Sequence, residues 1–265
     1  MKILFIGDIV ARIGRRCVQQ VLPDLIKQKA IDFVIAQSEN LTTGNGLTIE
    51  AVNEMREAGV NFFTGGNHTW KKSEFNQYLD DKSVPVIRPA NYPEGVPGRG
   101  YDIVDTDFGR ILIVSLLGQI VGAAPQVDNP LATIDRIMGE TANEKLDVRI
   151  LDFHGDYSSE KVGIGLYLDG KFSAVFGTHT HVPTADARIL PGGTAVITDA
   201  GMVGPHNTVL GVKPEIILDR WKTQMPRKHE VGDWPCEFDS VLVETDQKGH
   251  ATSIEQIRKI VDNKA

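Results

Sequence analysis

Short apolar runs rich in β-branched residues recur along this chain, and each is closed by a small or polar residue. Runs of five or six such residues predict buried strands. Between the first runs, apolar positions recur every three or four residues, which predicts amphipathic helices. The expected strands are 2–6, 32–37 and 60–64, and the expected helices are 14–29 and 48–58. This alternation predicts parallel strands joined by right-handed crossovers.

Two local signals refine the helices. Pro23 lies inside the first helical pattern, where a proline predicts a kink or a break. The second helix has Thr48 as a candidate N-cap and Gly59 just beyond its end.

The middle of the chain changes character. Residues 85–100 hold four prolines and three glycines, which predicts a loop-rich passage. A hairpin is expected around Asp107-Phe108-Gly109, and Asn129 and Pro130 are expected to open a helix. The further expected elements are hairpin strands 101–106 and 110–116, helix 130–142, strand 147–153, a helix from about 158, strands 172–176, 186–190, 194–198 and 238–245, and a strand or short helix at 251–261. We therefore predict one α/β domain over 1–265, with two sheets packed between helices.

Composition narrows the class of protein. The chain has 265 residues, 41% of them hydrophobic and 24% charged, which is typical of a globular protein with a sizeable core. The formal net charge of −7 argues against stable binding of nucleic acid or acidic membranes. An anionic substrate would therefore need local positive charge, which metal ions can supply.

The sequence shows no membrane-spanning run, no signal-peptide pattern and no cysteine motif. No apolar run approaches the ~20 residues that cross a bilayer, and the start of the chain lacks the layout of a signal peptide. Cys17 and Cys236 lie far apart in the sequence and form no metal-ligand spacing. We expect a cytoplasmic protein without a disulfide framework.

Candidate chemistry gathers where the predicted strands end. Five strand-like runs are each followed by residues that can bind metal or transfer protons: Asp8, Glu39-Asn40, Asn67-His68, His154 and His179-Thr180-His181. Open α/β sheets place their sites at the carboxyl ends of their strands. If these strand ends share one edge, the side chains form one site.

Each motif alone has an ordinary structural explanation. Asp8 could cap a helix, Glu39-Asn40 could open a polar loop, and His179 and His181 could be surface histidines. His154 could be a structural histidine at a strand end. Five independent turns have no reason to carry these ligand types at successive strand ends, so we favour a two-metal site. The other histidines, at 206, 229 and 250, lack such a context.

The motifs together resemble a known family. Gly7-Asp8, Gly66-Asn67-His68, His154 and the His-x-His motif are similar to calcineurin-like metallophosphoesterases. Ser38-Glu39-Asn40, and the lack of a histidine two residues after Asp8, resemble one branch, the YmdB-like cyclic-nucleotide phosphodiesterases. Further segments share that resemblance: Gly65-Gly66-Asn67-His68-Thr69-Trp70, Arg88-Pro89-Ala90-Asn91-Tyr92-Pro93, Asp152-Phe153-His154 and Asp199-Ala200-Gly201-Met202. The chain departs from the branch at Gly155-Asp156 and at His206-Asn207.

The resemblance implies a fold and a ligand set. It implies a four-layer α-β-β-α sandwich of the metallophosphoesterase type. One metal would be held by Asp8, Glu39, Asn40 and His181, and the other by Glu39, Asn67, His154 and His179, with Glu39 bridging. His68 would be the general acid. The cofactors would be two divalent or trivalent ions, iron first, with manganese or zinc as alternatives.

The expected reaction is hydrolysis of 2′,3′-cyclic nucleotides, with 3′,5′-cyclic nucleotides as further candidates, by in-line attack of a metal-bridging hydroxide. A phosphomonoesterase or nucleotidase on the same scaffold is one alternative. A regulatory cyclic-nucleotide-binding protein and a structural metalloprotein are the others. The expected partner is a small phosphodiester, and the sequence leaves a homo-oligomer open.

Overall fold

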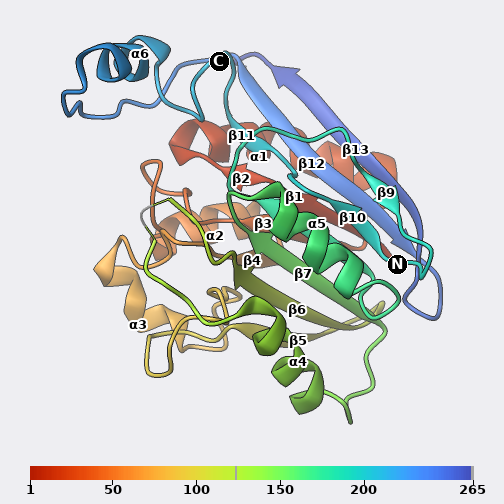
Figure 1. Ribbon diagram of the computed structural model, residues 1–265. Helices are drawn as coiled ribbons and strands as arrows, with labels where there is room; N and C mark the ends of the chain where they lie inside the picture. Colours follow the sequence, from red (N-terminus) through yellow and green to blue (C-terminus); the bar gives the residue numbers. More distant parts are fainter. Residues whose placement is uncertain (123, 264–265) are drawn as a thin grey trace.

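Two β-sheets form the centre of the protein in a computed structural model that describes residues 1–122 and 124–263 (Figure 1). The first sheet has the order β2-β11-β12-β1-β3-β4, and β13 pairs with β12. Its strands are β1 (Lys2–Ile6), β2 (Asp8–Ile9), β3 (Phe33–Gln37), β4 (Phe62–Thr64), β11 (Met202–Pro205), β12 (Cys236–Thr245) and β13 (Ala251–Val261). As predicted, β1, β3 and β4 run parallel. The closing segment, for which strand and helix were both open, is the strand β13.

The second sheet has the order β5-β6-β7-β8-β10-β9. Its members are β5 (Tyr101–Thr106), β6 (Gly109–Leu117), β7 (Val148–His154), β8 (Ala174–Thr178), β9 (Arg188–Ile189) and β10 (Ala195–Ile197). The predicted hairpin is confirmed, because β5 and β6 pair antiparallel. From β6 through β7 and β8 to β10 the strands are parallel, so their carboxyl ends share one edge.

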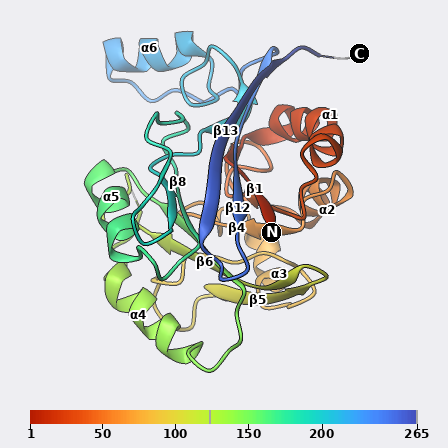
Figure 2. The ribbon, with the colours of Figure 1, turned by 90° about the vertical axis from the view of Figure 1, so that its right-hand side faces the viewer.

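Three apolar clusters hold the layers together. The inner faces of the two sheets meet around Phe5 and Phe176, whose rings stack with centroids 4.5 Å apart. Helices α1 (Ala11–Lys29) and α2 (Ile49–Glu57) cover the outer face of the first sheet, and α4 (Pro130–Glu140) and α5 (Ser158–Tyr167) cover the second. Figure 2 shows these helices on opposite sides of the sheets, which confirms the predicted four-layer α-β-β-α sandwich.

The predicted N-cap residues Thr48 and Asn129 do cap their helices. The Thr48 hydroxyl accepts a hydrogen bond from the Ala51 N–H, and the Asn129 side chain accepts from Leu131 and Ala132. The helix does not break at Pro23, since α1 continues to Lys29. The buried face of α1, which includes Val18 and Leu22, packs on the first sheet, and this packing outweighs the cost of the proline.

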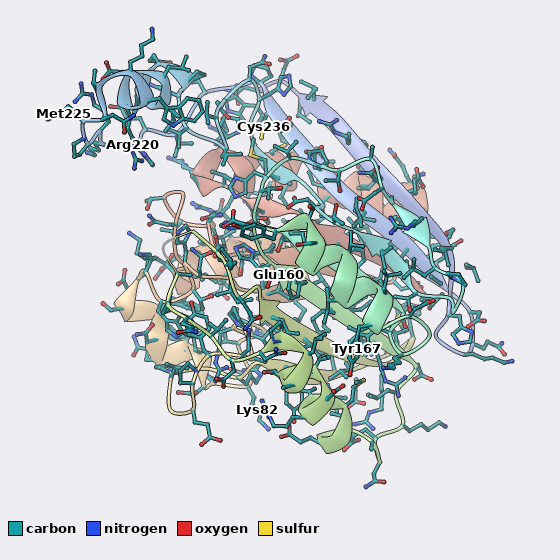
Figure 3. The ribbon with its side chains drawn as sticks, in the orientation of Figure 1. Lys82, Glu160, Tyr167, Arg220, Met225 and Cys236 are labelled. Atoms are coloured by element: carbon teal, nitrogen blue, oxygen red, sulfur yellow. The ribbon has the colours of Figure 1, made fainter. Side chains whose placement is uncertain are left out.

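The last 80 residues contain a helix that the sequence pattern did not predict. Helix α6 (Pro214–Thr223) projects from the sheets, with Arg220 and Met225 at its outer end (Figure 3). Only Ile217 of this helix is buried, and the apolar residues Leu218 and Trp221 are exposed. A short helix, α3 (Asn76–Leu79), and the 3₁₀ turn η1 (Ser73–Phe75) were also not predicted. Within the described residues, no helix has the length and apolar character needed to span a membrane.

The stacked rings between the sheets give a test of the core. Phe176→Ala should lower the free energy of unfolding by about 3–5 kcal/mol, because it leaves a cavity between two fully buried sheet faces. Urea denaturation followed by circular dichroism measures the change. Phe176→Leu, which keeps most of the volume, should cost clearly less, and equal losses for the two variants would contradict this account.

Candidate metal centre

The two sheets bring all the predicted site residues to one edge of the sandwich. Asp8 begins β2, just after β1, and Glu39 follows β3 by two residues. Asn67 and His68 follow β4 in the first sheet. From the second sheet come His154, the last residue of β7, and His179, the residue after β8. The carboxyl ends of parallel strands from both sheets therefore face each other across the site.

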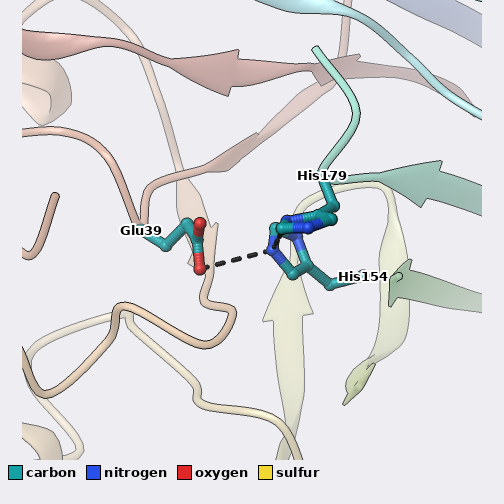
Figure 4. A group of neighbouring side chains, drawn as sticks. All are labelled: Glu39, His154 and His179. Atoms are coloured by element: carbon teal, nitrogen blue, oxygen red, sulfur yellow. Dashed lines mark hydrogen bonds and ion pairs between the residues drawn. The ribbon is translucent and has the colours of Figure 1, made fainter. Parts of the chain in front are cut away.

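One group of ligand-type atoms surrounds His154. Its Nε2 lies 3.0 Å from His179 Nδ1, 3.1 Å from Asn67 Oδ1 and 3.3 Å from Glu39 Oε2. Figure 4 shows Glu39 reaching toward His154 and His179 from the opposite sheet. Glu39, His154 and His179 each offer one ligand atom, and these atoms lie within 4.8 Å of one another. These four residues are one of the two predicted ligand sets.

A second group surrounds Asp8. His181 Nε2 lies 3.6 Å from Asp8 Oδ1, and the Asn40 amide nitrogen lies 3.3 Å from Asp8 Oδ1 and 3.1 Å from His181 Nε2. The Asp8 Oδ2 atom accepts a hydrogen bond from the backbone N–H of His179 at 3.2 Å, which links this group to the first. The structure thus brings together Asp8, Asn40 and His181 of the second predicted set.

The group around His154 fits a metal ion. Ligands about 2.1 Å from one ion, and at right angles to each other, lie about 3.0 Å apart. The atoms around His154 Nε2 lie 3.0–3.3 Å from it, as neighbouring ligands of one ion do. The donors are carboxylate, amide and imidazole groups without a thiolate, a set that suits iron, manganese or zinc. The residues present therefore fit a metal-binding group.

The site buries two carboxylates beside several histidines, and each group shifts the pKa of its neighbours. Asp8 and Glu39 are 0% and 1% exposed. Burial acts to raise the pKa of both carboxyls, but the neighbouring histidines outweigh it and hold the two pKa values below their usual range. Burial acts to lower the pKa of His154, yet the charges of Glu39 and Asp8 raise it to about 9. Burial and the charge of His154 lower the pKa of His179 to about 4, so this ring is neutral.

A polar layer beneath the site orients the His154 ring. Two groups face His154 Nδ1, the Thr178 hydroxyl at 2.9 Å and the Gln37 amide nitrogen at 3.0 Å. Thr178 donates its own proton to Asp152 Oδ1 at 2.7 Å, so its oxygen is left to accept from Nδ1–H. A pKa of about 9 gives the metal-free ring a second proton, on Nε2. A metal ion at Nε2 would displace that proton and leave the one on Nδ1 bonded to Thr178. Asp152 is fully buried, and burial raises its pKa to about 7.

His179 is oriented in the opposite sense. Its Nε2 lies 3.2 Å from Asp156 Oδ1, and Asp156 Oδ2 accepts a hydrogen bond from the Gly122 N–H at 2.7 Å. A proton on Nε2 leaves Nδ1, the nitrogen that faces His154, with a free lone pair. Asp156, one of the departures from the family pattern, is therefore placed to orient a ligand.

Asn40 stands between the second group and His68. Its amide oxygen lies 2.9 Å from His68 Nδ1, while its amide nitrogen faces Asp8 and His181. A metal ion binds the oxygen of an amide, and a half turn of the side chain would exchange the two atoms. In the present orientation Asn40 contacts His68 through the atom that would bind a metal.

Sequence reasoning did not select several residues that support the site. Gln37, Thr178 and Asp152 are polar residues within apolar strands, which is the one local sign of their role. Arg15 donates a hydrogen bond to the carbonyl of Leu41 at 2.6 Å and so supports the loop after Asn40.

Comparison with known proteins agrees with the fold and with the family that the motifs resemble. The model of the family described as YmdB-like protein matches residues 4–257. The 2′,3′-cyclic-nucleotide 2′-phosphodiesterase of Bacillus subtilis is 40% identical over 97% of this chain and 96% of its own. A hypothetical protein from Thermus thermophilus has a crystal structure with a TM-score of 0.91 and 36% identity, covering 98% of this chain and 100% of its own. A phosphatase from Mycoplasma pneumoniae has a TM-score of 0.92 and 32% identity, covering 100% and 95%.

The protein is a hydrolase with a sandwich of the metallophosphoesterase type. The chain belongs to the YmdB-like family, as the strand-end motifs predicted.

Gly66 provides a test of the site geometry. A methyl group at this position would meet Glu39 Oε2 and would lie 2.6 Å from His154 Nε2. Gly66→Ala should therefore abolish binding of metal at the His154 group while the protein still folds, as metal analysis and circular dichroism would show. Gly163→Ala is the matched control, because nothing lies within 4 Å of its added methyl group on α5. It should keep its metal and gain about 0.5–1 kcal/mol of stability. Full metal content in Gly66→Ala would contradict the placement of the centre.

Proposed function

We propose that this protein hydrolyses 2′,3′-cyclic nucleotides at a two-metal centre. One metal would be held by Asp8, Glu39, Asn40 and His181. The other would be held by Glu39, Asn67, His154 and His179. The observation that carries the proposal is the convergence of these seven side chains from both sheets, with buried Glu39 between the two groups. The name of the Bacillus subtilis relative supports the substrate class.

The metals supply one part of the chemistry. Bound ions would activate water and draw charge from the phosphoryl oxygens. The mixed nitrogen and oxygen ligands suit iron, manganese or zinc, and the family resemblance puts iron first. The protein contributes the ligand geometry, because Thr178 and Asp156 hold the two imidazoles with opposite nitrogens toward the site. It also keeps the carboxylates ionised in a buried site.

His68 is proposed to be the general acid. Its Nδ1 lies 2.9 Å from Asn40 Oδ1 and 3.1 Å from Glu39 Oε1, so this nitrogen is already engaged. Among the described residues, no hydrogen-bond partner is found for Nε2, and the side chain is 30% exposed. Nε2 is therefore the atom that can reach a substrate. When water adds to phosphorus and the bond to the 2′-oxygen breaks, that oxygen takes the proton from His68 Nε2, and the product is a 3′-monophosphate.

The substrate class can be tested directly. Protein stripped of metal by a chelator and reloaded with Fe²⁺ or Mn²⁺ should convert 2′,3′-cyclic AMP to one monophosphate, detected by chromatography. It should act more slowly on 3′-AMP and 5′-AMP, and the stripped protein should be inactive. Faster release of phosphate from the monoesters would favour the nucleotidase alternative. Tight binding of the cyclic nucleotide without turnover would favour a regulatory protein.

His68→Ala separates the acid from the ligands. This variant should keep its metals but lose about 10²–10⁴-fold in kcat on 2′,3′-cyclic AMP, whose alkoxide leaving group needs a proton. The loss on bis-p-nitrophenyl phosphate should be smaller, since nitrophenolate leaves without protonation. His250→Ala, which replaces an exposed histidine on a turn, is the control and should match the wild type. Loss of metal from His68→Ala would make His68 a ligand instead of the acid.

A further inference from the structure

A buried ion pair lies against the turn that carries His179 and His181. Lys161 comes from α5 and Asp199 follows β10, and their side chains are 3% and 1% exposed. Lys161 Nζ lies 2.8 Å from Asp199 Oδ2. Burying two charges is unfavourable unless their geometry is good and their remaining hydrogen bonds are satisfied. The partners of Asp199 therefore indicate what this pair does.

The Asp199 carboxylate accepts two hydrogen bonds from Thr180, the residue between the two histidines. Its Oδ2 accepts from the Thr180 backbone N–H at 3.0 Å and from the Thr180 hydroxyl at 2.7 Å. Its Oδ1 accepts from the Gly201 N–H at 2.9 Å. One carboxylate thus holds both donors of Thr180.

Asp199 also forms hydrogen bonds with Thr184, four residues after Thr180. The Asp199 N–H donates to the Thr184 hydroxyl at 2.9 Å, and the Thr184 N–H donates to the Asp199 carbonyl at 3.1 Å. Asp199 therefore forms hydrogen bonds with the segment after β8 at two positions, Thr180 and Thr184. Lys161 supplies the positive charge that lets this carboxylate remain buried beside it.

The turn needs such support because its backbone is unusual. His179 has a φ of 96° and His181 a φ of 62°. Residues with a Cβ rarely adopt these angles, and they persist only where the surroundings hold them. This backbone directs His179 Nδ1 toward His154 and His181 Nε2 toward Asp8. A change at Thr180 would displace both nitrogens together, although neither Thr180 nor Asp199 belongs to the proposed ligand sets.

We infer that Asp199, with its charge balanced by Lys161, is a positioning residue that holds the His179-Thr180-His181 turn in its metal-binding conformation. The inference rests on the two-metal centre of the proposed function. It assigns a role in metal binding to residues on α5 and after β10.

Two substitutions at Thr180 form a matched pair. Thr180→Val keeps the shape of the side chain but removes the hydroxyl donor, whereas Thr180→Ser keeps the donor and removes a methyl group. Mn²⁺ affinity can be measured from the free-ion signal in electron paramagnetic resonance. Thr180→Val should bind Mn²⁺ about tenfold more weakly than the wild type, and Thr180→Ser should restore binding to within about twofold. Equal affinity in the two variants would overturn the inference.

Lys161→Met tests the charge balance. It should also weaken Mn²⁺ binding, because Asp199 loses its cation. The control is Lys2→Met, which removes a lysine–carboxylate pair with a 3.0 Å contact to Glu244, at the end of β1 away from Asp8. That variant should bind Mn²⁺ like the wild type. If Lys161→Met fails to fold, the Thr180 pair still decides the question.

The outcomes separate this inference from the proposed function. A wild-type protein that binds Mn²⁺ but hydrolyses no cyclic nucleotide contradicts the function alone, and the Thr180 comparison then still tests the inference. A wild-type protein that binds no Mn²⁺ overturns both.

Discussion

The burial of Glu39 is the constraint on which the rest of the site depends. This carboxylate belongs to the first sheet, is 1% exposed and contacts His154 of the second sheet at 3.3 Å. Taking an ionised carboxylate out of water costs several kcal/mol unless opposite charge and hydrogen bonds compensate. Its other oxygen contacts His68 Nδ1, and the His68 backbone N–H donates to the carboxylate at 2.8 Å. Both sheets must therefore end beside Glu39, where His154 and His68 compensate its charge.

The same strands build the apolar core and the polar site because their character changes along their length. Toward the middle of the sandwich, Phe5 of β1 stacks on Phe176 of β8, and the sheets meet through apolar side chains. Two residues after Phe176, Thr178 contacts Asp152 and His154 in place of another apolar group. The rigid apolar layer fixes the distance between the sheets, and that distance sets how closely Glu39 approaches His154.

The sequence revealed those features that depend on neighbours in the chain. The apolar runs, the caps at Thr48 and Asn129 and the polar residues at strand ends are all local, and the structure bears out the resulting two-sheet sandwich and the meeting of the strand ends. Helix α6 was missed although Ile217, Leu218 and Trp221 have helical spacing; of these only Ile217 is buried, so the helix contributes little to the core. The Lys161–Asp199 pair joins residues 38 positions apart, and nothing local shows that a lysine in α5 is buried. A contact between residues far apart in the sequence, such as this pair, cannot be predicted from the pattern of neighbouring residues.

The orientation of the histidines shows why packing matters for chemistry. His154 presents Nε2 and His179 presents Nδ1, and these nitrogens lie 3.0 Å apart. An imidazole can offer either nitrogen, so its second partner decides which one is free. Thr178 occupies Nδ1 of His154, and Asp156 occupies Nε2 of His179. The two partners come from different strand ends, and each holds its ring so that the other nitrogen, Nε2 of His154 or Nδ1 of His179, faces the site. The ligand geometry is thus set by the protein before a cation binds, which lowers the cost of assembling the centre.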